Sequence, residues 1–347
     1  MKVAYIIPSL GASGPVIVVR NLVERMVAHG HECVVFYFDE RPDAMRFACE
    51  TRRISIWRRQ DFSAFDLVHA HCFRPMLYAA RLRNVKKMTT LHSYLFTEYR
   101  FSLGKPLGWL LGRFTMRVAR KYDKVAVLSE DARAYYSHWI PSEKLRVCYN
   151  GVRIDTFLST DSEQQRFAEN QEIISRFKGS STLIACICGL YPIKNIETMV
   201  RALALLPADY KLLLIGSGTS EKQLKRLAAE NGLTDRMLFL GRHVEAHRYL
   251  PQVDIFAMTS LSEGFCLSLT EAAMYGKKIV CADIAGMREK YSEDAVAFFA
   301  PDDFQGLANA IVEVNAQPQK GLRAKETAEQ RFTTENMYNA YQLIYNE

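Results

Sequence analysis

Between residues 255 and 276 the chain reads Ile255-Phe-Ala-Met-Thr-Ser-Leu-Ser-Glu263-Gly-Phe-Cys-Leu-Ser-Leu-Thr-Glu271-Ala-Ala-Met-Tyr-Gly276. The apolar run Ile255–Thr259 predicts a buried strand, and a helix is expected from about Ser268 to Tyr275. Gly264 lies in the turn between them, where a glycine lets the backbone approach a ligand closely. A buried strand that leads through a turn into a helix is typical of α/β proteins.

Short apolar runs alternate with helical stretches on both sides of this segment. In the first half, strands are expected at Val3–Pro8, Glu32–Phe38, Leu67–His71, Met88–His92 and Lys124–Ser129, with a helix at Val16–His29. In the second half, further strands are expected at Thr182–Cys188, Lys211–Ile215, Met237–Gly241, Lys278–Ala282 and Ala295–Phe299, with helices at Asn195–Leu206 and Ser220–Asn231. Apolar strands separated by helices indicate parallel sheets with right-handed crossovers. The sequence therefore predicts two tandem doubly wound α/β domains.

One interruption divides the two halves. Tyr149–Phe157 and the polar, charged segment Ser159–Lys178 break the alternation. We therefore expect the first domain over residues 1–165 and the second over residues 166–325. Residues 326–347 are expected to form a C-terminal helix, because Glu326–Tyr345 carries apolar and aromatic residues on one side.

The composition is that of a soluble globular protein. Hydrophobic residues make up 49% of the 347 residues and charged residues 24%. No apolar run approaches the roughly 18 residues that a membrane span needs. The start of the chain has no small-residue cleavage site, so a buried first strand explains it better than a signal peptide. The eight cysteines form no C-x-x-C pair, and several lie in strand-like runs. Reduced thiols and a cytoplasmic location are the expectation.

The charge is unevenly distributed. The net charge is +7; residues 1–150 carry 24 basic and 13 acidic side chains, a net +11, and the remainder carries 21 and 25, a net −4. Lys86, Lys87 and Lys105 lie near Leu103–Arg113, which includes Trp109 and four leucines. Such a mixture could lie on an anionic membrane surface. The alternative is a solvated face above a buried helix. Nucleic-acid binding is disfavoured, because no nucleic-acid motif is present.

The turn after Ile255–Thr259 has the features of an anion site. The backbone N–H groups of Cys266, Leu267 and Ser268 would face an anion at the start of the helix. Glu271, one turn into the helix, could accept hydrogen bonds from a ribose diol, and Glu263 could hold a sugar hydroxyl. Lys194, which follows another strand, could stabilise a departing diphosphate without a metal. No Asp-x-Asp occurs in the chain.

Two histidines are of a residue type that can bind a metal. His69 and His71 are one alternation apart in a predicted strand, so they should face the same side of the sheet. No third ligand accompanies them, and packing or hydrogen bonding is the simpler explanation. We therefore predict no metal site.

The chain also resembles a known family of enzymes. Glu263 and Glu271 have the spacing of the E-x7-E motif of retaining glycosyltransferases, and Glu-Gly-Phe-Cys-Leu resembles the EGFGL of glycosyltransferase family 4. Other segments that resemble the family are Ser13-Gly14, Val68–His71, Thr90–His92, Leu128–Glu130, Tyr149–Val152, Leu214–Gly218 and Phe239–Gly241. Each is weak alone, but their number, order and spacing cover nearly the whole chain.

The resemblance implies a fold and a set of roles. The fold is GT-B, two Rossmann-like domains facing across a cleft, with the C-terminal helix returning to the first domain. The catalytic residues would be His92, Lys194 and Glu263, with His92 contacting the transferred sugar. The donor-binding residues would be Gly14, Lys194, Glu263, Gly264, Phe265, Cys266, Leu267, Glu271, Gly216, Arg242 and His243. Among these, Gly14 and Lys194 would contact the phosphates and Glu271 would contact the ribose. Gly216, Arg242 and His243 would line the pocket of the base.

Two positions depart from the family pattern. The family places Gly-Arg six and five positions before the lysine, where this chain has Cys188 and Gly189. A diphosphate-binding arginine is therefore missing, and Arg242 or Arg288 are the candidates to replace it. Ser13 stands where the family has glycine.

We predict a retaining, metal-independent enzyme without a cofactor. It would move a hexosyl or N-acetylhexosaminyl group from a UDP- or GDP-sugar to a hydroxyl of a glycolipid or polysaccharide precursor. Peripheral attachment to the inner face of the membrane would suit such an acceptor. One alternative is a degenerate GT-B protein that binds nucleotide or lipid without turnover. Another is a different GT-B enzyme, such as a nucleotide-sugar epimerase, against which the carboxylate spacing argues.

Overall fold

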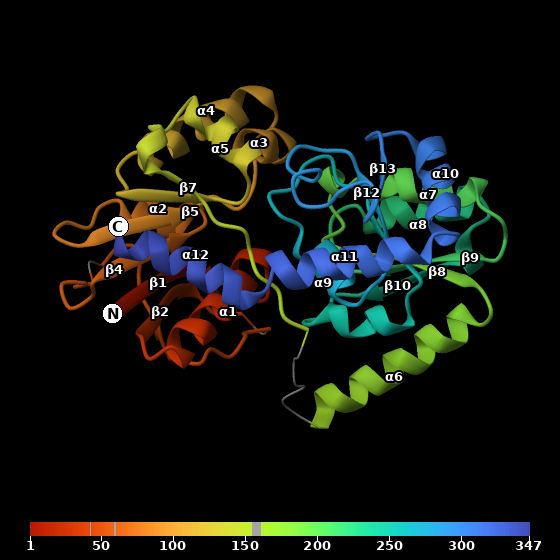
Figure 1. The fold of residues 1–347 in the computed structure, drawn as a ribbon, viewed down its shortest axis with the longest axis horizontal. Helices are drawn as coiled ribbons and strands as arrows, with labels where there is room; N and C mark the ends of the chain where they lie inside the picture. The colour runs from red at the N-terminus through yellow and green to blue at the C-terminus, as the bar shows by residue number, and fades with distance from the viewer. Residues whose placement is uncertain (42, 59, 155–160) are drawn as a thin grey trace. The chain divides into compact units, whose positions relative to one another are not determined.

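The computed structural model describes residues 1–41, 43–58, 60–154 and 161–347. The chain divides into two compact units. Unit 1 comprises Met1–Val152 and Phe332–Glu347, and unit 2 comprises Arg153–Arg331. Each is built on one parallel sheet with helices packed against it (Figure 1). The predicted pair of doubly wound α/β domains is confirmed.

The sheet of unit 1 has the order β3-β2-β1-β4-β5-β6-β7. Its strands are β1 (Lys2–Ser9), β2 (Glu32–Asp39), β3 (Glu50–Arg53), β4 (Leu67–His71), β5 (Lys86–Thr90), β6 (Lys124–Val127) and β7 (Leu145–Val147). Its helices are α1 (Gly14–Ala28), α2 (Phe73–Ala79), α3 (Leu95–Leu103), α4 (Lys105–Ala119), α5 (Glu130–Ser137) and α12 (Thr334–Asn346), with a short 3₁₀ turn, η1 (Ser142–Lys144). Strand β1 pairs with β2 and β4, and β4 is buried along its whole length.

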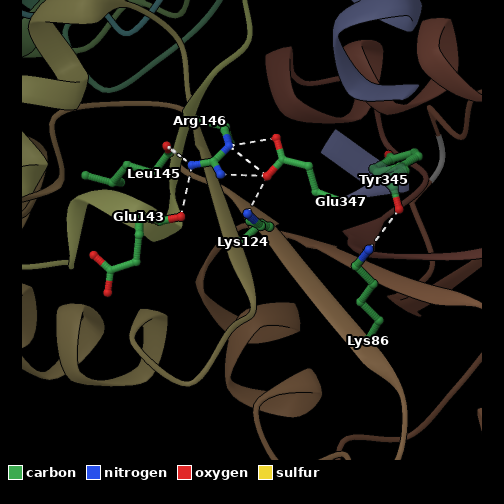
Figure 2. Close-up of polar contacts among 7 residues, drawn as sticks. All are labelled: Lys86, Lys124, Glu143, Leu145, Arg146, Tyr345 and Glu347. Carbon is green, nitrogen blue, oxygen red and sulfur yellow. Dashed lines mark hydrogen bonds and ion pairs between the residues drawn. The ribbon is translucent and has the colours of Figure 1, made fainter. Parts of the chain in front are cut away.

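The end of the chain is held on unit 1. Helix α12 packs beside α1, although the two lie at opposite ends of the sequence (Figure 1). Figure 2 shows the Glu347 carboxylate accepting hydrogen bonds from Arg146 and Lys124, which lower its pKa to about 2. Strands β6 and β7 are thereby tied to the last residue of the chain.

The sheet of unit 2 has the order β10-β9-β8-β11-β12-β13. Its strands are β8 (Thr182–Ile187), β9 (Tyr210–Ile215), β10 (Met237–Gly241), β11 (Ile255–Met258), β12 (Lys278–Ala282) and β13 (Ala297–Phe299). Its helices are α6 (Asp161–Lys178), α7 (Ile196–Leu205), α8 (Glu221–Glu230), α9 (Leu267–Met274), α10 (Phe304–Asn315) and α11 (Pro318–Arg331), and its 3₁₀ turns are η2 (Pro192–Lys194), η3 (Thr234–Arg236) and η4 (Ala246–Gln252). All paired strands are parallel, so their carboxyl ends share one edge of the sheet.

The unit boundaries differ from those expected. The boundary predicted at residue 165 falls inside α6, and the one predicted at residue 325 falls inside α11; both helices belong to unit 2. The single helix expected over Glu326–Tyr345 is two helices, α11 and α12. They are separated at Phe332, which is fully buried and whose carbonyl accepts a hydrogen bond from Val152 N at 2.9 Å. Thr333 then caps α12 by accepting from Asn336 N.

Candidate functional site

In unit 2 the predicted site residues follow the carboxyl ends of adjacent strands. Lys194 follows β8, Gly216 follows β9 and Glu263 follows β11, and these three strands are neighbours in the sheet. Ligands of open α/β sheets bind at this edge. The topology therefore brings together residues that lie up to 69 positions apart in sequence.

Lys194 and Glu263 form an ion pair. Lys194 Nζ lies 2.6 Å from Glu263 Oε1, which also accepts from Ser260 Oγ at 2.7 Å. Their side chains are only 23% and 13% exposed. Burial alone would lower the pKa of Lys194, but the adjacent carboxylate outweighs it and raises this pKa above its ordinary value. The ammonium is therefore charged at neutral pH.

The backbone joins the two loops that carry this pair. Thr259 Oγ1 donates to the carbonyl of Lys194 at 2.8 Å, and Leu261 N donates to the carbonyl of Ile193 at 2.9 Å. These bonds hold η2 against the segment after β11. The cation is thus preorganised at the sheet edge, as electrostatic stabilisation of developing charge requires.

The turn before α9 has an unusual backbone. Cys266, the N-cap residue of α9, has φ 64 and ψ 79 and makes no side-chain cap hydrogen bond. This left-handed conformation costs a non-glycine residue about 1–2 kcal/mol, which explains why the family motif has glycine here. Phe265 is buried beneath the turn, and Leu267 is the first residue of α9. Glu271 lies one turn further and is half-buried.

Close backbone packing surrounds Gly216. Its φ is 148, and a Cβ atom there would lie 1.8 Å from the carbonyl oxygen of Cys188. Gly216 N donates to the carbonyl of Gly241 at 2.8 Å, so the loops after β8, β9 and β10 meet. Arg242 directly follows Gly241. His243 Nε2 lies 3.1 Å from the Leu240 carbonyl, and its Nδ1 lies 3.4 Å from Tyr249 Oη. Both ring nitrogens of His243 therefore have partners within the protein.

The missing arginine has a local explanation. A Cβ atom at Gly189 would lie 2.6 Å from the ring of Tyr191, so this ring occupies the place where an arginine side chain would begin. Arg288, one proposed replacement, is instead bound to Asp283 and Glu293 and lies 4.6 Å from the Phe298 ring centroid. Arg288 is therefore already paired and does not replace the missing arginine.

Lys290 is a site feature that the sequence did not reveal. Its side chain is 1% exposed, and its Nζ donates to the carbonyl of Gly264 at 3.0 Å. A lysine between Glu289 and Tyr291 reads as an ordinary surface cation. Only the topology shows that it lies under the turn after Glu263.

Unit 1 carries the other two predicted residues. Gly14 is the first residue of α1, directly after the extended N-cap Ser13. His92 follows β5 and is half-buried. Its Nε2 lies 2.9 Å from Nδ1 of His71, and no described residue hydrogen-bonds its Nδ1.

His69 and His71 belong to a buried polar network. His69 bonds to Tyr345 of α12 at 2.7 Å and to Thr90 at 2.8 Å, and Thr90 bonds to Tyr341 at 2.9 Å. The pKa of His71 is far below its ordinary value, mainly because the ring is buried and also because two other histidines lie nearby. Burial lowers the pKa of His92 to about 4. Both rings are therefore neutral at pH 7. Among the described residues, no group of three or more histidine, cysteine, aspartate or glutamate side chains is arranged to hold a metal.

The His71–His92 bond predicts the tautomer of His92. Nε2 of His71 is buried without a partner among the described residues, and an orphaned acceptor is more common than an orphaned N–H. His71 Nδ1–H should therefore donate, which leaves the hydrogen of His92 on Nδ1. Histidine ¹⁵N NMR should show this tautomer in the wild type and in His71→Asn, whose amide can still donate. His71→Leu should shift His92 toward the Nε2–H form, and His138→Leu, at an exposed position, should not. A bare Nδ1 in the wild type would contradict the assignment.

Comparison with known proteins agrees with this architecture. The family profile "Glycosyl transferases group 1" matches residues 167–331, and "Glycosyltransferase Family 4" matches residues 12–156. The O-antigen biosynthesis glycosyltransferase WclY of Escherichia coli is 25% identical over all of this chain and 98% of its own length. The lipopolysaccharide core mannosyltransferase LpsB of Rhizobium meliloti is 26% identical over 74% of this chain and 71% of its own length. The structure of Anabaena HepE in complex with UDP and glucose has a TM-score of 0.82 at 18% identity, covering 100% of both chains.

The two parallel-sheet units and these similarities identify a glycosyltransferase of the GT-B fold. The two profiles cover both units in the family's order. The chain belongs to glycosyltransferase family 4.

Proposed function

We propose that this protein is a retaining glycosyltransferase that uses a UDP- or GDP-sugar. The observation that carries the proposal is the partly buried Lys194–Glu263 pair beside the start of α9. Glu271 would hold the ribose and Glu263 a hydroxyl of the sugar. Lys194 and the first turn of α9 would meet the diphosphate, since a helix N-terminus favours anions.

We propose that these residues support a front-face displacement. The bond from C1 of the sugar to the diphosphate oxygen breaks, and its electron pair leaves with the diphosphate. The acceptor oxygen attacks C1 on the same face, and its proton passes to the departing phosphate oxygen. Lys194 would stabilise the charge that develops on the leaving group. We propose that no metal is needed for this stabilisation.

A ligand panel tests the proposal. One nucleotide sugar among UDP-, GDP- and ADP-linked donors should raise the melting temperature specifically, and release of its nucleoside diphosphate should continue in EDTA. NMR of the product should show the anomeric configuration of the donor. Binding without turnover would favour the degenerate alternative, which the missing arginine at Gly189 supports. Activity that disappears in EDTA and returns with Mn²⁺ would contradict metal independence.

We propose a lipid-borne or polysaccharide acceptor. WclY is named for O-antigen biosynthesis and LpsB for lipopolysaccharide core biosynthesis, which supports this class of acceptor. No helix in the described part of the chain is both long and apolar enough to span a bilayer. We propose that the enzyme reaches such an acceptor by contact with the membrane surface.

The outer face of α3 and α4 could provide that contact. The two helices lie side by side (Figure 1), and Gly108 and Gly112 allow close packing, since a Cβ at either would lie within 2.7 Å of α3 atoms. Exposed large apolar side chains on this pair are Phe101, Leu103, Leu107, Trp109, Leu110 and Phe114. Residues 99–122 contain six basic and no acidic side chains. An exposed apolar stripe flanked by cations suits an anionic bilayer surface.

The structure corrects which lysines belong to this surface. Lys86 Nζ donates to the carbonyl of Tyr345 at 2.9 Å, as Figure 2 shows, and Lys87 Nζ donates to that of Leu82 at 3.0 Å. Both were expected to face lipid, but their ammonium groups stabilise the fold of unit 1. Lys105, Arg113 and Arg117 of α4 are exposed and take their place.

Vesicle binding should depend on α4. Each cation near an anionic leaflet contributes about 1 kcal/mol. We expect co-sedimentation with phosphatidylglycerol vesicles that weakens with salt and is lost when Lys105, Arg113 and Arg117 become glutamate. Leu107→Gln/Leu110→Gln should also reduce it severalfold. The matched control, Val312→Gln/Leu322→Gln, replaces exposed apolar residues of unit 2 and should bind normally. Equal binding to neutral phosphatidylcholine vesicles would count against this surface.

A further inference from the structure

Lys290 is a buried cation that forms no ion pair with any described residue. It lies in the segment between β12 and β13, and no carboxylate of the described residues comes within ion-pair distance of its Nζ. Its two contacts are the carbonyl of Gly264 and the ring of Phe265, whose centroid is 5.2 Å from Nζ. Burying an unpaired ammonium costs several kcal/mol, and one hydrogen bond with one cation–π contact offsets only part of that.

The Lys290 ammonium lies at the turn before α9. Gly264 and Phe265 are the two residues that follow Glu263 in the turn before α9. The ammonium therefore lies under the backbone predicted to hold the sugar and face the diphosphate. A charge in a water-excluded region acts over longer distances than one in solvent. A costly buried charge beside a candidate site indicates a functional role rather than a stabilising one.

We propose that Lys290 supplies the second positive charge of the diphosphate site, the one that family members obtain from the arginine absent at Gly189. Because Lys290 is 1% exposed, it acts through the turn and its electric field and not by touching the ligand. It is a positioning residue, fixing the Gly264 carbonyl while it favours an anion above the turn. This inference rests on the proposed diphosphate site.

The ionisation of Lys290 supports this role. Burial lowers its pKa to about 8, with Cys266, Glu289, Cys281 and Glu263 as the facing groups that partly restore it. The ammonium is therefore largely charged at pH 7 and neutral at pH 9. Burial raises the pKa of Cys266 to about 12, so this thiol does not titrate in that interval.

Two substitutions separate charge from anchoring. Lys290→Gln keeps an N–H donor for the Gly264 carbonyl and removes the charge, whereas Lys290→Met removes both. Calorimetry should use UDP and uridine, or GDP and guanosine if the guanine nucleotide gives the larger thermal shift. We expect Lys290→Gln to bind the diphosphate roughly tenfold more weakly, Lys290→Met to bind it more weakly still, and both to bind the nucleoside within twofold of the wild type. Wild-type affinity for the diphosphate should also fall between pH 7 and pH 9, and that of Lys290→Gln should not.

Lys278→Met is the matched control. Lys278 is another partly buried lysine, but it begins β12 and so lies at the amino edge of the sheet; its Nζ donates to Asn315. This variant should bind UDP normally. If Lys290→Gln binds UDP like the wild type, or if UDP and uridine lose affinity equally, the charge role is overturned. A wild-type protein that binds no nucleoside diphosphate would instead refute the proposed function itself.

Discussion

Replacing Lys194 with alanine should lower the rate of transfer by roughly 10²-fold or more, by analogy with the removal of a single oxyanion donor. Lys194 Nζ is held 2.6 Å from Glu263 and is mostly buried, so its charge is available without reorganisation when the diphosphate departs. The loss should appear in turnover, because the leaving group gathers charge in the transition state. Release of nucleoside diphosphate from the best donor, measured under saturating conditions, checks this.

The substitution also leaves the Glu263 carboxylate without its ion-pair partner. A control must therefore separate the loss of turnover from a loss of stability. Removing one partner of a buried pair destabilises a protein, typically by about 3–5 kcal/mol. Lys194→Ala/Glu263→Ala should recover melting temperature without recovering turnover. Lys225→Ala, which breaks an exposed pair with Glu221 in the same unit, should change neither. A Lys194→Ala rate within threefold of the wild type would refute the assigned role.

The fold could be predicted where a strand forms a mainly apolar run between turn signals. β4, β10 and β12 have the bounds that their sequences predicted, because their residues are apolar or lie in uninterrupted runs between turn signals. β3 was missed because Glu50–Arg53 is polar and exposed along its length. Helix α6 was not predicted, because it lies in the polar, charged segment Ser159–Lys178, which only marked a break in the alternation. Local pattern identifies elements that bury a face, and these two bury little.

In the candidate site, the residues that are close in sequence could be predicted, and the contacts between distant segments could not. Glu263, Gly264 and Glu271 are close in sequence, so their spacing alone indicated a shared turn and helix. The Lys290–Gly264 contact spans 26 residues and the His71–His92 contact spans 21, and each joins segments that only the sheet order brings together. The sequence did not reveal that Arg288 is already paired, because its acidic partners, Asp283 and Glu293, lie five residues away on either side and no periodicity links them.

Glu271→Ala should weaken donor binding by about 1.5–3 kcal/mol, the contribution of hydrogen bonds to a charged group. Glu271 is the fifth residue of α9, one turn beyond the residues predicted to meet the diphosphate, where a carboxylate can reach a ribose diol. Calorimetry with UDP and 2′-deoxy-UDP, or with their guanine counterparts, compares the effect of removing the 2′-hydroxyl in the wild type and in the variant. The wild type should lose affinity for the deoxy ligand, and Glu271→Ala should bind both ligands with the same reduced affinity. Glu230→Ala, at the end of α8, should behave like the wild type. If Glu271→Ala still discriminates between the two ligands as the wild type does, the carboxylate does not hold the 2′-hydroxyl.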